Sequence, residues 1–357
     1  MPTVSLCMIV RDEEQALPRC LDSVAGLVDE IIIVDTGSAD GTKAAAKRFT
    51  DRIFDFEWID DFAAARNFAF DHGTGDYLMW LDADDLLLPE DARRFAELKR
   101  TLPPDTDAVM MRYATGFDGQ GRVTFSYYRE RLVKRTRHFR WREPVHEYLE
   151  TSGHILTSEI CVTHRKLRPA VPGRNLAIYE SRLAAGEILS PRGCYYYARE
   201  LKDGGRNADA AAQFARFLDG GQGWVEDNIT ACAELAECYG RMGRPELRLP
   251  TLARSFAYDT PRAEICCRMG YVYKAAEDFG RAAFWFRLAL TLRRPRGNWG
   301  FIQEEYWGYI PAIELAVCCD RLGRAREAAH YNELAGKYKP GDPAVEYNRR
   351  YFRSRGE

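Results

Sequence analysis

The chain has 357 residues, of which 46% are hydrophobic and 29% are charged, and its formal net charge is -2. This composition excludes a largely disordered chain and is typical of a globular protein. Because the length exceeds the size at which a single hydrophobic core usually keeps growing, we expect two domains. The near-neutral charge points to no particular class of partner.

The first residues of the chain and the spacing of its cysteines indicate the cellular compartment in which we expect the protein. No positively charged segment precedes the first short apolar run, and no stretch of about 18 apolar residues occurs. The ten cysteines include the adjacent pairs Cys266–Cys267 and Cys318–Cys319, but no CxxC spacing that would organise zinc or a redox disulfide. We therefore expect a cytoplasmic protein without a membrane span and with reduced thiols in its core.

Short β-branched runs alternate with helix-like stretches in the first half of the chain, as in an α/β domain with a mainly parallel sheet. Val4–Val10 and Glu30–Asp35 are predicted strands, and residues 13–28 between them carry apolar residues at helical spacing. A turn and a short helix follow over 36–49, and residues 76–81 form another apolar strand.

Acidic residues follow these strands where they end: Asp12, Asp35 and the run from Asp82 to Asp85. Ligands of an open α/β sheet bind at the carboxyl ends of its strands, so these residues are candidates for a site. Asp82 and Asp84 place two hard oxygen ligands where a divalent cation can be held together with a diphosphate. The alternative is an acidic turn that only caps the following helix.

From about residue 191 the strand signals stop, and Ala-, Tyr- and Leu-rich helices punctuated by glycine follow. They match the tetratricopeptide template, in which small residues let paired helices approach closely and aromatics fill the space between pairs. The best copy carries Gly270, Tyr273, Ala282, Phe286, Ala289 and Pro295. A second copy carries Ala316, Ala328, Ala335 and Pro340, and weaker copies begin near Pro191 and Asn228.

Two segments interrupt these patterns. Residues 165–175 contain proline and glycine and are the best candidate for a linker. The predicted domains are therefore 1–168, a linker and first helix over 169–190, and an all-α repeat domain over 191–357. Residues 296–309 separate the last two repeat copies and are rich in aromatics, which favours an inter-repeat loop packed down by its own rings over a binding feature.

Four segments, in their order and spacing, resemble the family 2 glycosyltransferases of the GT-A fold: 4–13, 34–42, 61–67 and 77–85. Relatives with a C-terminal tetratricopeptide array, among them the sublancin-type peptide S-glycosyltransferases, have further segments similar to 139–147 and 160–164. The resemblance is strong to about residue 165 and loose through the repeats. It implies a Rossmann-like GT-A domain that transfers a sugar from a nucleotide-sugar, a UDP-sugar by preference. The transfer would invert the configuration at the anomeric carbon and would use Mn²⁺ or Mg²⁺ as cofactor.

The resemblance also implies where the nucleotide base binds. Asp35 would face the uracil or equivalent base, with Val10 and Arg11 at the end of the first strand beside it. Asp12 stands where many relatives have Asn, which leaves the detail of base recognition open.

The remaining donor and metal contacts follow from the same comparison. Arg66 would lie near the nucleotide, and Asp82 with Ala83 near the ribose or the metal. Asp84 would bind the metal. His164 would complete the metal site or touch the diphosphate, and the alternative for it is a purely structural histidine.

A single displacement at the anomeric carbon needs a base to accept the acceptor's proton, unless the acceptor is a thiol that is already partly ionised. The candidates are His146, Glu147 and Glu143. The alternative is a hairpin whose charges face solvent.

Arginines crowd the run 129–142, where Phe139 and Trp141 interleave with them. A nucleic-acid footprint would fit these residues, but alternation with apolar side chains favours a strand with one solvated basic face. Arg131 is the candidate for holding the diphosphate, because guanidinium groups suit phosphate oxygens.

Three functions fit the sequence. The first is a glycosyltransferase whose repeats present a concave surface to a protein or peptide acceptor, at Ser, Thr or Cys. The second is a glycosyltransferase acting on a cell-envelope glycan or lipid-linked acceptor, with repeats that serve oligomerisation or docking. The third is a non-catalytic scaffold, against which the acids Asp35, Asp82 and Asp84 argue. The sugar stays undetermined, and a homodimer is compatible with a repeat array.

Overall fold

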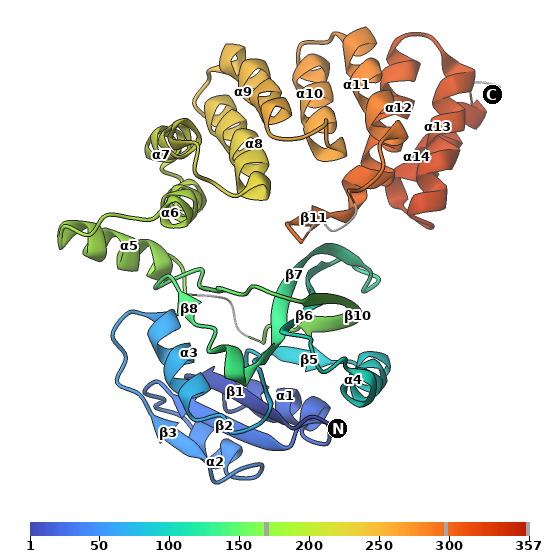
Figure 1. Ribbon diagram of the computed structural model, residues 1–357. Coiled ribbons are helices and arrows are strands. Elements are labelled where there is room, and N and C mark those ends of the chain that lie inside the picture. The colour runs from blue at the N-terminus through green and yellow to red at the C-terminus, as the bar shows by residue number, and fades with distance from the viewer. Residues whose placement is uncertain (168–170, 296–298, 355–357) are drawn as a thin grey trace. The chain divides into compact units, whose positions relative to one another are not determined.

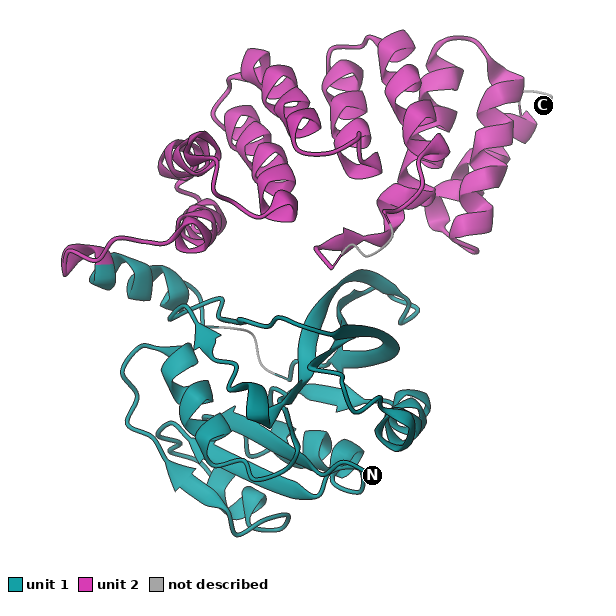
Figure 2. Ribbon diagram, viewed as in Figure 1, with its two compact units in different colours: residues 1–182 teal, residues 183–357 magenta. Residues whose placement is uncertain are grey.

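The computed structural model describes residues 1–167, 171–295 and 299–354. The chain divides into two compact units, Met1–Arg182 and Leu183–Glu357 (Figure 2). The first is an α/β unit and the second is built from helical pairs, so the predicted fold class is confirmed. The division falls inside the predicted linker and first helix, whose boundaries at 168 and 190 stay a prediction. Pro169 lies outside the described residues.

The main sheet of the first unit has the strand order β3-β2-β1-β4-β7-β6-β10-β5. The bounds are β1 Val4–Val10, β2 Glu30–Asp35, β3 Ile53–Asp55, β4 Tyr77–Met79, β5 Asp85–Leu87, β6 Ala108–Phe117, β7 Val123–Lys134 and β10 Ile155–His164. Strands β3, β2, β1 and β4 are parallel, whereas β7 runs antiparallel to β4 and β6. The parallel strands bring their carboxyl ends, and the acids that follow them, to one edge.

Helices cover both faces of this sheet (Figure 1). Side chains alternate along β1, so Leu6 and Met8 face the core completed by α1 and α4, whereas Cys7 faces the core beneath α3. The helix bounds are α1 Ala16–Val24, α2 Thr42–Ala46, α3 Phe62–Asp71, α4 Pro89–Thr101 and α5 Arg174–Ala184. A small antiparallel pair, β8 Trp141–Arg142 and β9 Tyr148–Leu149, lies apart from the main sheet.

The second unit consists of consecutive antiparallel helix pairs, α6 with α7, α8 with α9, α10 with α11 and α12 with α13, followed by α14. The bounds are α6 Pro191–Asp203, α7 Asn207–Gly220, α8 Val225–Arg241, α9 Arg248–Arg254, α10 Ala263–Ala275, α11 Phe279–Thr291, α12 Tyr309–Arg321, α13 Ala325–Tyr338 and α14 Pro343–Ser354. Each predicted repeat copy, the weaker ones included, corresponds to one of these pairs.

The small residues of the repeat template lie where two helices approach most closely. Gly270 on α10 faces the ring of Phe286 on α11, and a Cβ placed on Gly270 would lie 2.8 Å from the ring atom Cζ. Ala282 and Ala289 are fully buried in the same pair. The side chains therefore pack as the tetratricopeptide pattern predicts.

Two further expectations concern the whole described chain. No helix within residues 1–167, 171–295 and 299–354 is long and apolar enough to cross a membrane. All ten cysteines are free thiols, and all are buried except the partly exposed Cys161 and Cys194.

Candidate active site

Asp35 ends β2 at the carboxyl edge of the sheet and is fully buried. Its Oδ1 accepts hydrogen bonds from the backbone N–H groups of Gly37 (3.0 Å) and Ser38 (2.8 Å). Its Oδ2 is shielded from solvent and has no hydrogen-bond partner among the described residues. Val10 pairs with Asp35 in the β1–β2 register, and Arg11 follows it, so the predicted neighbours lie together. A buried acceptor without a partner is costly unless a ligand satisfies it.

Asp12 ties the end of β1 to the loop after β2. Its φ of +55° lies in the left-handed region that Asp and Asn tolerate best among non-glycine residues. The N–H of Ala39 donates to Asp12 Oδ1 (2.7 Å), and the N–H of Asp12 donates to Ser38 Oγ (2.9 Å). Asn supports the same backbone geometry, so the departure at this position leaves the loop intact.

The acidic turn, residues 82–85, joins β4 to β5. The N–H of Asp85 donates to the carbonyl of Asp82 (3.0 Å), and Asp85 Oδ2 accepts from the N–H of Asp82 (3.0 Å). Ala83 is buried in the sheet core and anchors the turn. Helix α4 begins only at Pro89, and its N-cap, Leu88, makes no side-chain capping bond. The alternative in which this turn merely caps the next helix is therefore wrong.

Arg66 of α3 connects the acidic turn to the 143–147 loop. Its guanidinium donates to Asp82 Oδ1 and to Glu147 Oε1, both at 2.7 Å. It contacts the indole rings of both Trp80, at 4.7 Å, and Trp141, at 4.9 Å, which pack edge-to-face on each other. Charge pairing and the two ring contacts fix the Arg66 side chain, and with it the orientation of the Asp82 carboxylate.

Arg131 of β7 forms a second buried ion pair. It is 0% exposed, and its Nη1 lies 3.0 Å from Asp85 Oδ2. The guanidinium stacks on Trp80 at 3.7 Å and on Tyr113 at 4.3 Å. In this position Arg131 holds Asp85, and its predicted contact with a diphosphate stays a prediction.

A group of potential metal ligands lies beside these pairs. One ligand atom each from Asp84, Asp85 and His164 lies within 4.8 Å of the others. His164 Nδ1 is 3.2 Å from Asp84 Oδ1 and 3.0 Å from Asp85 Oδ1. Asp84 keeps 21% of its side chain exposed, whereas Asp85 is fully buried. Carboxylates with an imidazole fit a divalent ion such as Mn²⁺. The predicted ligands Asp84 and His164 are thus together, but Asp82 is engaged by Arg66.

The pKa shifts agree with this crowding of charge. Although burial alone would raise it, the charges of Arg66 and Arg131 lower the pKa of Asp82 to about 2. Burial raises the pKa of Asp84, and the neighbouring carboxylates act in the same direction. Burial alone would lower the pKa of His164, but its hydrogen bond to Asp85 and the charge of Asp84 raise it above its usual value. A cation at Asp84 would relieve this repulsion.

The 143–147 loop, which carries the three candidate bases, is held against α3. The N–H of Phe62 donates to the carbonyl of Pro144 (2.8 Å), and just before the loop Asn67 exchanges two hydrogen bonds with the backbone of Trp141, at 3.1 and 2.9 Å. Glu147 is the candidate that reaches Arg66. Glu143 and His146 have φ values of +72° and +53°, so the backbone of this loop is strained at both positions.

The arginines of β7 differ from the expectation of a solvated basic face. Arg131 is buried, and Arg129 keeps only 19% of its side chain exposed. Arg129 stacks on Trp80 at 4.8 Å and donates to the carbonyl of Glu147 at 3.1 Å. These arginines point inward because Trp80 and the acids beneath them offer rings and charge partners.

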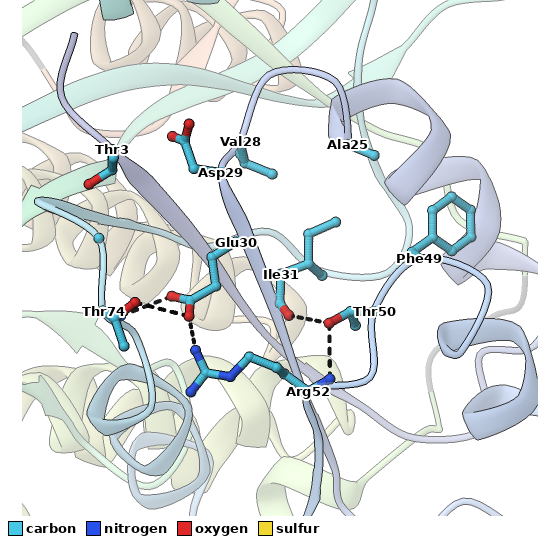
Figure 3. Close-up of a pocket in the computed structure, with 11 residues that line it drawn as sticks. Thr3, Ala25, Val28, Asp29, Glu30, Ile31, Phe49, Thr50, Arg52 and Thr74 are labelled. Atoms are coloured by element: carbon cyan, nitrogen blue, oxygen red, sulfur yellow. Dashed lines mark hydrogen bonds and ion pairs between the residues drawn. The ribbon is translucent and has the colours of Figure 1, made fainter.

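One hollow of about 590 Å³ lies elsewhere, at the opposite edge of the sheet, where β2 begins. Figure 3 shows its polar side chains bonded to one another: Glu30 pairs with Arg52 and accepts from Thr74, and Thr50 donates to the carbonyl of Ile31. Because these groups satisfy each other, this hollow offers no match to the chemistry at the acidic turn.

Three residues that the sequence reasoning missed are central to the site. Asp85 holds His164 and Arg131, and the signal available was its place in an unbroken acidic run. The rings of Trp80 and Trp141 both contact the guanidinium of Arg66. Their ring faces become visible only when β4, β7 and β8 come together, so no local pattern reveals them.

Comparison with known proteins finds relatives that match parts of the chain. Residues 5–158 match the family described as glycosyl transferase family 2. A TPR repeat-containing protein of Synechococcus elongatus is 42% identical over 154 residues, which are 43% of this chain and 36% of that protein. The SPbeta prophage-derived glycosyltransferase SunS of Bacillus subtilis is 28% identical over 213 residues, 56% of this chain and 49% of that protein. The chain thus spans half or less of the curated relatives it matches.

Among solved structures, the MamA protein is 15% identical and covers 46% of this chain and 80% of its own, with a TM-score of 0.36. The type IV pilus biogenesis factor PilW is 15% identical and covers 50% of this chain and 74% of its own, with a TM-score of 0.40.

Proposed function

From the premise that residues 5–158 form a glycosyl transferase family 2 domain, we propose that the chain transfers a sugar from a UDP-sugar to a side chain of a polypeptide. One observation carries the proposal: the open acceptor of Asp35 and the carboxylate of Asp84 follow parallel strands whose carboxyl ends lie at the same edge. A base and a metal-bound diphosphate are the two ends of a nucleotide-sugar's leaving group.

Asp35 selects the base in this proposal. An ionised carboxylate only accepts hydrogen bonds, so its Oδ2 requires an N–H or O–H donor on the ligand. Uracil offers a ring N–H at N3, as guanine does at N1, whereas adenine and cytosine donate only from their exocyclic amino groups. The bonds from Gly37 and Ser38 hold Asp35 Oδ1 and thereby aim Oδ2.

The acidic turn holds the phosphate end. Asp84, with His164 and Asp85, would bind Mn²⁺ or Mg²⁺, which supplies charge stabilisation to the departing diphosphate. Arg66 keeps Asp82 ionised and oriented beside it. The site therefore has its charges in place before the donor arrives.

The acceptor's proton goes to the 143–147 loop. Because Glu147 is held by Arg66, we assign it to orienting that arginine. His146 and Glu143 are then the candidate bases, and pH profiles of transfer by His146→Gln and Glu143→Gln distinguish them. A thiol acceptor would depend less on either residue, because a thiol ionises more readily than a hydroxyl.

A thermal-shift screen of nucleotide-sugars with and without Mn²⁺ tests the donor site. A ligand that binds only the folded state raises the melting temperature. We expect a metal-dependent increase with UDP-sugars that is lost in Asp84→Ala and kept in the control Asp22→Ala, whose side chain is exposed on α1. No shift with any nucleotide-sugar would contradict the proposal.

Product analysis tests the acceptor. The tetratricopeptide-type unit is the reason to expect a polypeptide, since helical repeats offer extended concave surfaces to such partners. Mass spectrometry of reactions offered peptides or envelope glycans should find the sugar on the peptide. Transfer to glycans alone would assign the repeats a different purpose.

A further inference from the structure

The segment that joins α11 to α12 folds back across the repeat unit. We call residues 299–307 the strap. It contains the short strand β11 (Ile302–Gln303), labelled in Figure 1, and the turn η4 (Glu304–Trp307). Residues 296–298, which belong to the aromatic loop noted in the sequence, lie outside the described residues.

The strap contacts the first helix of successive repeat pairs. The ring of Phe301 lies 4.8 Å from the guanidinium carbon of Arg199 on α6. Gly300 approaches α8 so closely that a Cβ there would lie 2.9 Å from the side chain of Glu226. The strap therefore runs along the helix face that repeat proteins of this type use as their inner surface.

The second half of the strap continues along the same face. The ring of Tyr306 lies 5.2 Å from the guanidinium carbon of Arg268 on α10. Turn η4 then packs against α12, and Glu305 pairs with Lys339 at 2.8 Å. The prediction that aromatic rings pack this loop down is correct. The rings, however, contact helices of several repeats and not only the loop itself.

Polar atoms of the strap and of the helix α10 beneath it are left without partners. Glu264 Oε2, Arg268 Nη1 and Trp299 Nε1 are shielded from solvent and form no hydrogen bond within the described residues. Burial also raises the pKa of Glu264. Buried donors and acceptors that lack partners carry a desolvation cost with no compensation, so the strap fits this surface incompletely.

We propose that the strap is a tethered occupant of a peptide groove, and that an extended acceptor segment with aromatic side chains displaces it. The incoming rings would stack on Arg199 and Arg268 as Phe301 and Tyr306 do. Backbone N–H and C=O groups of the acceptor would satisfy Glu264 Oε2 and Arg268 Nη1. This inference rests on the proposed function only in calling the displacing polypeptide the acceptor.

The charges of the groove favour a polypeptide over a nucleic acid. Glu226 lies on α8, between the helices that carry the two arginines, and Glu264 lies on α10; Arg262 pairs with Glu226 at 2.8 Å. A phosphate backbone would meet these carboxylates, whereas a peptide backbone is neutral and offers both donors and acceptors.

A tether also explains how such a groove would be regulated. A segment linked at both ends competes at an effective concentration on the order of millimolar, so an untethered peptide with the same contacts binds wild-type protein weakly. Removing the ring contacts of the strap should open the groove without changing its walls.

Fluorescence polarisation with a labelled synthetic peptide of sequence 299–307 tests the proposal on the full-length chain. We expect Phe301→Ala/Tyr306→Ala to bind the probe at least about tenfold more tightly than wild type, because the tethered competitor is weakened. Adding Arg268→Ala should abolish the gain. The matched control Phe284→Ala removes an exposed ring from α11 and should leave binding as in wild type.

The proposal is overturned if Phe301→Ala/Tyr306→Ala melts like wild type and binds the probe no more tightly. It is also overturned if a scrambled peptide or an RNA oligonucleotide binds this variant as tightly as the probe does. If the variant fails to fold, amide hydrogen exchange of the wild-type protein decides. Saturating probe should speed exchange of the 299–307 amides and leave the exchange rates of the α10 amides unchanged. No acceleration in 299–307 refutes displacement. The thermal shift caused by a nucleotide-sugar is measured in a separate experiment. Failure of the groove proposal can therefore be distinguished from failure of the proposed donor site.

Discussion

The buried carboxylate Asp85 of the first unit has a close counter-charge, whereas the buried carboxylate Asp227 of the second unit has one at longer range. Arg131 and Asp85, from β7 and the acidic turn, approach to 3.0 Å with both side chains fully buried. In the second unit Arg192 and Asp227 are 3.9 Å apart. The difference teaches how burial of a carboxylate is offset: at Asp85 by an ion pair in contact, and at Asp227 only in part.

Breaking the Arg131–Asp85 pair should have the largest effect. Arg131→Met leaves the buried Asp85 with His164 alone beside it, and losing one partner of a buried pair costs about 3–5 kcal/mol of unfolding free energy. Urea denaturation followed by tryptophan fluorescence measures the loss. The control Arg93→Met removes a side chain that is 77% exposed and should change stability little. Equal unfolding free energies of Arg131→Met and Arg93→Met would show that the Arg131–Asp85 pair does not stabilise the fold.

Asp227 tests whether charge in the second unit is left under-compensated. Burial raises the pKa of Asp227 to about 6, against the opposing charges of Arg192 and Arg199. Because the folded state then holds a proton that the unfolded state releases near pH 4, unfolding free energy should fall by about 3 kcal/mol as pH rises from about 4 to 6. Asp227→Asn should flatten that fall, whereas the exposed Asp209→Asn should keep it. An unchanged pH profile in Asp227→Asn would contradict this account.

Gly270 tests the close helix packing on which the second unit depends. The methyl group in Gly270→Ala meets the buried ring of Phe286, and overpacking of this kind costs about 1–3 kcal/mol. Gly220→Ala at the end of α7 meets nothing within 4 Å and should be neutral or slightly stabilising. Thermal melts of the two variants give the comparison, and matched melting temperatures would rule out a tight contact.

Asp35 sharpens the contrast, because its buried Oδ2 is an acceptor without a hydrogen-bond partner among the described residues. Asp35→Asn lets Oδ1 keep its loop contacts but places an amide N–H against the base, so UDP affinity should fall about tenfold, or about 1.4 kcal/mol. Isothermal calorimetry measures the affinity, and a melt without ligand checks that stability is kept. Undiminished affinity would remove Asp35 from base recognition.

The sequence predicts the elements of both units well where one local pattern decides them. Alternation and acid-ended strands identify β1, β2 and the acidic turn, and small residues at repeat spacing identify the helix pairs. The inward-facing Arg129 and Arg131 were not predictable, because an arginine-rich strand looks solvent-facing until Trp80 is placed beneath it. The strap was equally hidden, since its contacts with α6 and α10 are long-range.

The most direct test of the metal and diphosphate site is electron paramagnetic resonance of Mn²⁺ titrated with full-length protein and UDP. Bound Mn²⁺ loses the sharp signal of the free ion. The account predicts that wild-type protein with UDP removes this signal and that Asp84→Ala does not. A signal that stays at its free amplitude with wild type, or that vanishes equally with Asp84→Ala, would contradict a cation at the acidic turn.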